Sequence, residues 1–407
     1  MNNDIKNGCH VMAKPTGSTC NLNCTYCFYL EKHKLYRESS KQFMDQYTLE
    51  NYIRQHIEAQ SADVVEFAWQ GGEPTLAGLA FYKKAVELQK KYAGRKQIHN
   101  NLQTNGIIID DLWCQFFKEN NWLIGISIDG PMELHDIYRV NRSGKGSHQK
   151  VIKAVTLLKY YQIEFNILAV INNHNVKHPQ KVYNYLKSLG TAHIQFIPLI
   201  ERENRNAPSH ELRLISPGFQ PLSYVTSWSV EAKAYGQFLA DVFTAWVEKD
   251  IGRVFIQLFD SLLGVWCGYP AQMCSFSERC GHAFALEANG DIYNCDHYVY
   301  PEHKLGNINE TKIITINNSE RAKQFANDKK LNLSTDCHFC PFLKVCHGGC
   351  PKHRFIASSS GQKNHNYFCE GYKIFFTRSA PYMKLMRNLI NRGISPAELM
   401  NMTVQRE

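Results

Sequence analysis

Short apolar runs of strand length alternate with longer amphipathic segments through the first half of the chain. The strand-like runs are HVMAKP (10–15), VVEFAWQ (64–70), IHNNLQT (98–104), LIGISID (123–129), EFNILAVI (164–171) and HIQFIPLI (193–200). The helix-like segments between them include TLENYIRQHIEAQ (48–60), LAFYKKAVELQKKY (79–92), IDDLWCQFFKENN (109–121) and HQKVIKAVTLLKYY (148–161). Six alternating β/α units predict a parallel sheet with helices outside it. In barrels of this kind, functional residues lie at the carboxyl ends of the strands.

The pattern changes after the sixth strand-like run. Residues 201–233 are rich in Pro, Ser, Asn and Arg without clear periodicity, which predicts a long loop that closes the site and then a linker. Residues 382–400 have the pattern of a terminal helix that packs on the body. The expected domains are a barrel (1–235), a linker and helix (236–265), a cysteine-rich domain (266–385) and a C-terminal helical tail (386–407).

Composition limits the class of protein. The 407-residue chain is 44% hydrophobic and 20% charged, as in a globular protein. Its formal charge is +9, but Lys and Arg are scattered along the chain, so no nucleic-acid partner is expected. No segment resembles a signal peptide, and none approaches the roughly 18 uninterrupted apolar residues of a membrane span. No membrane association is expected, and the expected location is cytoplasmic.

Most of the fourteen cysteines fall into two groups. Cys20, Cys24 and Cys27 form a C-x3-C-x2-C motif near the start of the chain. Eight more are Cys274, Cys280, Cys295, Cys337, Cys340, Cys346, Cys350 and Cys369. A reducing cytosol does not sustain a disulfide framework, and thiolates packed this closely usually bind metal. Three thiolates are one short of a closed four-ligand site, whereas eight are enough for two such sites.

Several motifs of the first half gain meaning together. Alone, the three-cysteine motif is also compatible with a partial zinc knuckle or chance clustering, QGGEP (70–74) with an ordinary Gly-Pro turn, and Arg139 with a solvated helix charge. Placed at successive strand ends, they resemble the radical S-adenosylmethionine (SAM) enzymes, which fold as a partial (β/α)6 TIM-like barrel. The resemblance implies that Cys20, Cys24 and Cys27 hold a [4Fe-4S] cluster. Its open iron binds SAM, which one electron splits to a 5′-deoxyadenosyl radical.

The same resemblance assigns contacts to SAM. Gly72 and Glu73 of the QGGEP motif are expected to grip its amino group. Ser127 and Arg139 are expected to clamp its carboxylate, because a hydroxyl and a guanidinium suit that group. The remaining contacts carried over are Tyr26 and Ile200.

The later cysteines are not spaced as in a zinc ribbon. CGHAFALEANGDIYNC (280–295) reads C-x9-G-x4-C, and CHFCPFLKVCHGGC (337–350) reads C-x2-C-x5-C-x3-C. This region resembles the SPASM domain, which carries auxiliary [4Fe-4S] clusters in peptide-modifying radical SAM enzymes. The resemblance assigns the first auxiliary cluster to Cys274, Cys280, Cys295 and Cys350, and the second to Cys337, Cys340, Cys346 and Cys369. The expected cofactors are therefore three [4Fe-4S] clusters and SAM. Cys9 and Cys267 have no assignment, and Cys114 is expected to be buried in a helix.

One subgroup is matched over nearly the whole chain. The segments HVMAKPTGSTCNLNCTYCFYLEK, QGGEPTL, QTNG, IDGP and CDHYVYPEHKLGN resemble the anaerobic sulfatase-maturating enzymes. These enzymes oxidise a Ser or Cys of a nascent sulfatase to Cα-formylglycine without oxygen. The radical removes a hydrogen from Cβ, and the second electron leaves through the auxiliary clusters. The resemblance implies that Asp296 is the base for the hydroxyl or thiol proton, and that Tyr29 and Gln70 line the substrate cavity.

The implied partners are an unfolded sulfatase polypeptide with a C/S-x-P-x-R motif and an electron donor such as flavodoxin or ferredoxin. Two other functions remain open from the sequence. One is a different SPASM-type peptide modification, such as thioether or crosslink formation. The other is a non-catalytic zinc-binding module, which iron and acid-labile sulfide analysis would distinguish.

Overall fold

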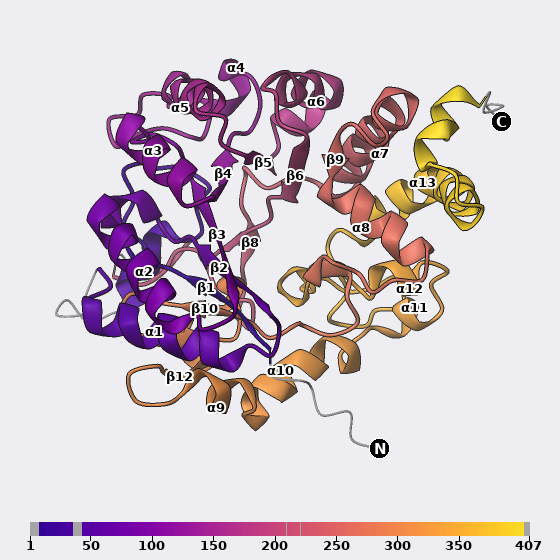
Figure 1. Cartoon of the computed structure of the whole chain (residues 1–407). Coiled ribbons are helices and arrows are strands. Elements are labelled where there is room, and N and C mark those ends of the chain that lie inside the picture. The colour runs from indigo at the N-terminus through magenta and orange to yellow at the C-terminus, as the bar shows by residue number, and fades with distance from the viewer. Residues whose placement is uncertain (1–7, 36–42, 209, 220, 403–407) are drawn as a thin grey trace.

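A ten-stranded sheet runs through the molecule (Figure 1). The computed structural model describes residues 8–35, 43–208, 210–219 and 221–402. Its sheet has the strand order β12-β11-β10-β1-β2-β3-β4-β5-β6-β9. The six predicted strands are present as β1 (His10–Ala13), β2 (Val64–Trp69), β3 (Gln97–Thr104), β4 (Leu123–Ser127), β5 (Phe165–Ile171) and β6 (His193–Pro198). Each pairs in parallel with the next, as the β/α alternation predicts.

Helices connect these strands on the outside of the sheet (Figure 1). They are α1 (Gln46–Ala59), α2 (Leu79–Tyr92), α3 (Asp111–Glu119), α4 (Met132–His135), α5 (His148–Tyr160) and α6 (Pro179–Ser188). Local capping fixes where two of them begin. Asp45 accepts a hydrogen bond from the backbone N–H of Thr48 at the start of α1, and Asp110 accepts one from Trp113 at the start of α3. These caps satisfy N–H groups that have no partner within the helix.

The chain between the barrel and the cysteine-rich region contains more structure than the expected linker and single helix. A two-stranded sheet of β7 (Arg202–Glu203) and β8 (Tyr224–Val225) braces the expected loop. Two helices then follow, α7 (Ala232–Lys249) and α8 (Gln257–Trp266), with β9 (Phe255–Ile256) between them. β9 adds in parallel to β6, and so covers that edge of the barrel sheet. A strand of two residues leaves no period that a sequence pattern could reveal.

The cysteine-rich region continues the barrel sheet at its other edge. Its elements are β10 (Ala283–Leu286), β11 (Asp291–Tyr293), β12 (Lys304–Asn307), α9 (Ile313–Asn317), α10 (Glu320–Leu331), α11 (Thr335–His338), α12 (Leu343–Cys346) and α13 (Cys369–Asn391). β10 pairs in parallel with β1, with Val11 opposite Phe284, and β11 and β12 follow antiparallel. The region is therefore built onto the barrel, which fixes its loops near the carboxyl end of β1.

Helix α13 fastens the end of the chain to α7 (Figure 1). Gly371 of α13 lies so close to α7 that a Cβ at this position would lie 1.9 Å from the backbone oxygen of Ala232. The packing expected of the terminal helix is confirmed by its buried residues Met383 and Met386. Its expected bounds were wrong, because α13 begins at Cys369 and ends at Asn391, and a short 3-10 helix follows at Pro396–Asn401.

Within the described ranges, the chain forms no helix of the length and hydropathy needed to cross a bilayer. The residue bounds expected for the four domains stay predictions.

Candidate active site

The loop that follows β1 brings three thiols together. Cys20, Cys24 and Cys27 are mostly buried, and burial raises the pKa of Cys20 and of Cys24 to about 12. Negative charge on Cys27 raises the pKa of both thiols further, and Cys20 has the same effect on Cys24. Backbone hydrogen bonds from Asn23 to Val140 and from Thr25 to Tyr138 tie the loop to the segment after β4. Because thiols repel one another once ionised, this cluster suits a bound metal centre that supplies positive charge.

The QGGEP loop after β2 packs directly on the cysteine loop. The N–H of Gly72 donates to Gly17 O at 2.7 Å, and the N–H of Glu73 donates to Thr19 O at 2.8 Å. A Cβ at Gly72 would lie 2.2 Å from Thr19 O, so only glycine allows this approach. The two motifs that sequence analysis placed at neighbouring strand ends are therefore in contact.

Glu73 is buried and already bonded within the protein. Its Oε1 accepts from the N–H and hydroxyl of Thr75 and from the hydroxyl of Thr104, and its Oε2 accepts from Asn105 N–H at 2.9 Å. Burial raises the pKa of this carboxyl, and the hydrogen bonds oppose that rise. Oε2 takes one donor where Oε1 takes three, so Oε2 is the atom with capacity for a further donor.

A buried trio lies on the other side of the cysteine loop. The Tyr26 hydroxyl donates to Asp129 Oδ2 at 2.5 Å, and Arg139 Nε lies 3.0 Å from the same oxygen. The Arg139 guanidinium also lies over the Tyr26 ring. Ser127 is placed at the end of β4, where its hydroxyl accepts from Gln103 at 3.0 Å. Arg139 is thus held by Asp129, a residue that the sequence analysis did not single out. Ile200 is buried just after β6.

Asp296 lies where the cysteine-rich region meets β1. Lys14 directly follows β1, is almost completely buried, and lies with its Nζ 2.5 Å from Asp296 Oδ1. Burial disfavours ionisation of Asp296, but the charge of Lys14 outweighs burial and holds the pKa of Asp296 below its ordinary value. Lys14 also lies 4.0 Å from the centre of the Tyr29 ring. Asp296 is therefore a carboxylate kept ionised inside the protein by one buried cation.

Tyr29 connects this pair to a second acid. Its hydroxyl donates to Glu287 at the end of β10. Burial raises the pKa of Glu287 to about 8, although Lys14 acts in the opposite direction. Glu287 is therefore mostly protonated at neutral pH, while Asp296 is ionised. The single charge of Lys14 is matched by one carboxylate.

The other edge of the barrel also contacts the cysteine-rich region. Lys352 forms a buried ion pair with Glu201, which follows β6. Lys32 donates to Val299 O at 2.9 Å and lies 3.1 Å from the centre of the Tyr300 ring. Burial lowers the pKa of Lys32 to about 7. The cysteine-rich region therefore bridges the gap that the sheet leaves between β1 and β6.

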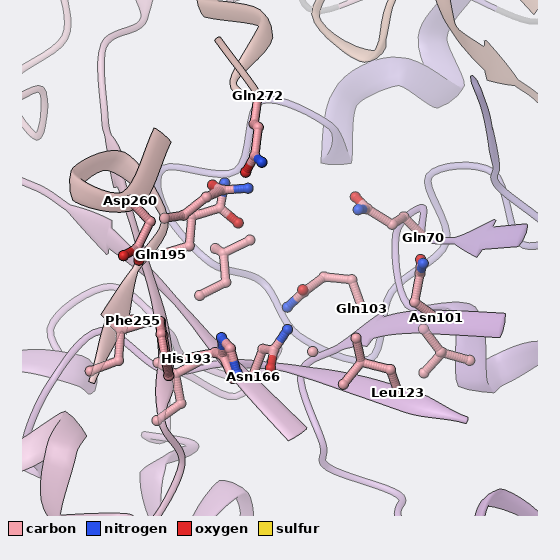
Figure 2. A pocket seen from close by; sticks show the side chains of 16 residues that line it. Gln70, Asn101, Gln103, Leu123, Asn166, His193, Gln195, Phe255, Asp260 and Gln272 are labelled. Atoms are coloured by element: carbon pink, nitrogen blue, oxygen red, sulfur yellow. The ribbon is translucent and has the colours of Figure 1, made fainter. Parts of the chain in front are cut away.

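A polar cavity of about 520 Å³ opens on the inner face of the sheet (Figure 2). Gln70, one of the expected substrate contacts, lines it together with residues of β3 to β6, β9 and α8. Asp260 of α8 is its one acidic lining residue, and burial raises the pKa of this carboxyl to about 6. Tyr29, the other expected contact, does not line this cavity and instead packs against Lys14.

The eight later cysteines assemble in the two expected sets. In the first set, Cys350 lies close enough to Cys280 and Cys295 to raise their pKa values. Cys274 lies close enough to raise the pKa values of Cys280, Cys295 and Cys350. In the second set, Cys337 and Cys340 lie close enough to Cys346 and Cys369 to raise their pKa values. All four cysteines line one small cavity. Each set gathers four sulfur ligands at one place, which suits a four-coordinate metal centre or cluster.

Two cations lie among these thiols and were missed from the sequence. The Arg354 guanidinium is affected by cysteines of both sets, and its three nitrogens donate to backbone oxygens of residues 329 and 347–349. Lys329 lies beside Cys280 and Cys350, and its ammonium donates to Cys274 O at 2.5 Å. Both cations are suited to offset negative charge on clusters bound by the two sets.

Histidines also border the first set. His297 and His353 place a ring nitrogen with the Cys350 sulfur so that the three atoms lie within 4.8 Å of one another. Burial lowers the pKa of His297 to about 3, so this ring is neutral. The Nδ1 atoms of both rings are buried without a hydrogen-bond partner in the described structure, which fits the presence of a further group at this place. Of the unassigned cysteines, Cys114 is buried in α3, as expected.

Comparisons with known proteins agree with this arrangement. Residues 15–186 match the radical SAM superfamily, and residues 274–341 match the SPASM iron-sulfur cluster-binding domain. A serine-type anaerobic sulfatase-maturating enzyme of Bacteroides thetaiotaomicron is 44% identical over 96% of this chain and 94% of its own. A cysteine-type enzyme of Clostridium novyi is 35% identical over 91% of this chain and 94% of its own.

The fold agrees as well. The structure of native anSMEcpe with bound AdoMet and Cp18Cys peptide has a TM-score of 0.81 to this chain, at 33% identity, and the match covers 94% of this chain and 99% of that chain. The expected fold, a partial barrel followed by a SPASM domain, is thereby confirmed, and the non-catalytic zinc module is excluded. This chain belongs to the anaerobic sulfatase-maturating enzymes, a family of radical SAM enzymes that carry a SPASM domain.

Proposed function

We propose that this enzyme oxidises a Cys or Ser residue of an unfolded sulfatase polypeptide to Cα-formylglycine without oxygen. The observation that carries the proposal is the buried pair of Lys14 and Asp296 at the carboxyl end of β1. Lys14 is also close enough to Cys27 to affect its pKa, so the carboxylate lies near the loop expected to hold the SAM cluster. A general base at that place meets the requirement for removing the side-chain proton of the target residue.

The proposed cofactors are SAM and three [4Fe-4S] clusters. Cys20, Cys24 and Cys27 hold the SAM-binding cluster, and the two later cysteine sets hold the other two. The proposed SAM contacts are Tyr26, Gly72, Glu73, Ser127, Arg139 and Ile200. When bound, cluster and SAM supply the radical that removes a hydrogen atom from Cβ of the target residue. The proposed redox partner is an electron donor such as flavodoxin or ferredoxin.

The residues around Asp296 favour its action as a general base. Lys14 keeps the carboxylate ionised and fixes its direction. The proton that Asp296 accepts comes from the hydroxyl or thiol of the target, so one base serves either residue. Tyr29 lies beneath Lys14 and holds the cation in place through its ring. The Asp296 side chain is 21% exposed, so the carboxylate is held by Lys14 and still open to a bound substrate.

Incubation with synthetic peptides tests the proposal. The anaerobically reconstituted enzyme is mixed with SAM, reductant and a peptide carrying C-x-P-x-R or S-x-P-x-R, and the peptides are analysed by mass spectrometry. We expect the Ser peptide to lose two hydrogens. The Cys peptide should lose two hydrogens to give a thioaldehyde, which water hydrolyses to the aldehyde with release of hydrogen sulfide. An intramolecular crosslink also removes two hydrogens, so reaction of the product with a hydrazide must report the aldehyde. Peptides that stay unchanged while SAM is cleaved would contradict the proposal.

Replacing Lys14 with Met should separate radical formation from product formation. The substitution keeps an unbranched side chain, one atom shorter than lysine, but leaves Asp296 without its cation, and an unpaired carboxylate that is largely buried tends to take up a proton. We expect the yield of formylglycine per 5′-deoxyadenosine to fall about 10- to 100-fold, the range for losing a charge-assisted hydrogen bond. Lys14→Arg restores the charge and should recover part of the yield. An unchanged ratio in Lys14→Met would show that Lys14 does not act on the base.

A further inference from the structure

The inner face of the barrel is polar where such barrels are normally filled with branched apolar side chains. Along four neighbouring strands, alternate residues line the cavity of about 520 Å³. These inward positions are Asn101 and Gln103 on β3, Leu123 and Gly125 on β4, Asn166 and Leu168 on β5, and His193 and Gln195 on β6. Most of them carry amides or small side chains, which leaves the interior open (Figure 2).

Apart from Gln103, which donates to Ser127, the carboxamides that line this cavity have no side-chain partner in the part of the chain that the structure describes. Six of them make no side-chain hydrogen bond within the described parts of the chain: Gln70, Asn101, Asn166, Gln195, Gln257 and Gln272. Some buried amides elsewhere in the chain are paired with one another. Asn100, for example, exchanges hydrogen bonds with Gln89 and accepts one from Trp69. Carboxamides that are left unpaired around one cavity are free to bind a guest.

The charge of the cavity is equally specific. Its sixteen lining residues include one acid, Asp260, and no Lys or Arg. Asp260 is half-buried and forms no ion pair or hydrogen bond with any residue that the structure describes. A carboxylate in such a place is solvated by water alone until a cation reaches it. The cavity is therefore unsuited to phosphates or other anions, and suits a neutral chain with one basic group.

Peptide main chain has this chemistry. A carboxamide side chain offers two N–H donors and one carbonyl acceptor, which match the carbonyl and N–H of a peptide unit. Amides on opposite walls can therefore hold an extended backbone whatever its side chains. Figure 2 places Gln70 and Asn101 on one side of the cavity, and Gln195 and Asp260 on the opposite side.

We infer that this cavity binds the main chain of the sulfatase segment beside the target residue, and that Asp260 binds the guanidinium of its motif arginine. The inference rests on the proposed function and adds a specificity-determining residue to it. Asp260 lies on α8 in a cavity that neither Lys14 nor Asp296 lines, so it acts on peptide binding and has no part in the chemistry.

A double-mutant cycle tests the contact between Asp260 and the arginine. Full-length reconstituted enzyme, wild type or Asp260→Asn, is assayed with a C-x-P-x-R peptide and with the same peptide carrying citrulline in place of arginine. Citrulline keeps the shape of arginine without its charge. We expect either single change to raise the KM for peptide about 10- to 100-fold with little change in kcat, as for a lost charge-assisted hydrogen bond. The two changes together should cost no more than one of them.

Controls separate this inference from the proposed function. Asp241→Asn on α7 makes the same substitution outside the cavity and should leave the KM unchanged. Gln195→Met should raise the KM for the arginine and citrulline peptides alike, because it removes a main-chain contact. Additive effects of the two changes, or an Asp260→Asn enzyme with wild-type KM for the arginine peptide, would overturn the contact. The citrulline peptide tests the charge without altering the protein, so a folding defect cannot hide the answer. If the wild-type enzyme converts neither peptide, the proposed function fails.

Discussion

Replacing Cys24 with Ala should abolish SAM cleavage while leaving most of the iron in place. Cys24 is the middle thiol of the loop after β1, and a cluster with an open iron needs all three thiolates of that loop. The two later cysteine sets take their ligands from residues 274–369 alone, so they keep all eight thiols. With three clusters of equal size, we expect about a third of the iron to be lost. Iron and acid-labile sulfide analysis measures the loss, and 5′-deoxyadenosine production measures cleavage.

Cys114→Ala is the matched control for this experiment. Cys114 is completely buried in α3, outside all three cysteine sets, and its replacement should leave both iron content and SAM cleavage unchanged. Normal cleavage by Cys24→Ala would mean that the SAM cluster is bound elsewhere. Loss of all iron would mean that the three cluster sites depend on one another for folding.

The six strands of the barrel could be predicted because each is a short apolar run bounded by helices of clear periodicity. The elements that were missed lack such a signal. β9 has two residues, and β10 belongs to the barrel sheet only through its pairing with β1, some 270 residues earlier in the chain. Pairing over that separation depends on tertiary packing, which a local pattern does not contain.

The two cysteine sets follow from the resemblance of this region to the SPASM domain, because spacing alone does not say which cysteines share a set. The charged residues around the cysteines could not be predicted from the sequence. Lys14 and Asp296 come from distant segments, as do Tyr26 and Asp129. A single Lys in an apolar stretch usually keeps its ammonium group in water by extending its aliphatic side chain toward the surface. That Lys14 instead stays buried is decided by Asp296 and Tyr29, which only the fold brings to it.

Asp296→Asn should stop formylglycine formation and leave radical formation intact. Removing hydrogen from Cβ and removing the proton of the hydroxyl or thiol are separate requirements, and the carboxylate serves the second one. Asparagine keeps the shape of the side chain and can still accept a hydrogen bond from Lys14, but its amide does not accept a proton at neutral pH. We therefore expect normal iron content and normal 5′-deoxyadenosine, with formylglycine reduced roughly 10²- to 10⁴-fold, as for the loss of a general base.

Combining Asp296→Asn with Lys14→Met tests whether Lys14 acts through Asp296. If Lys14 acts only through Asp296, the double variant should be no worse than Asp296→Asn alone, because the base is already absent. Asp291→Asn provides a control in the same module, since Asp291 lies on β11 and pairs with Lys304 instead of Lys14. It should retain near wild-type yield. If Asp296→Asn also makes formylglycine at the wild-type rate, the carboxylate serves the structure and another group must be the base.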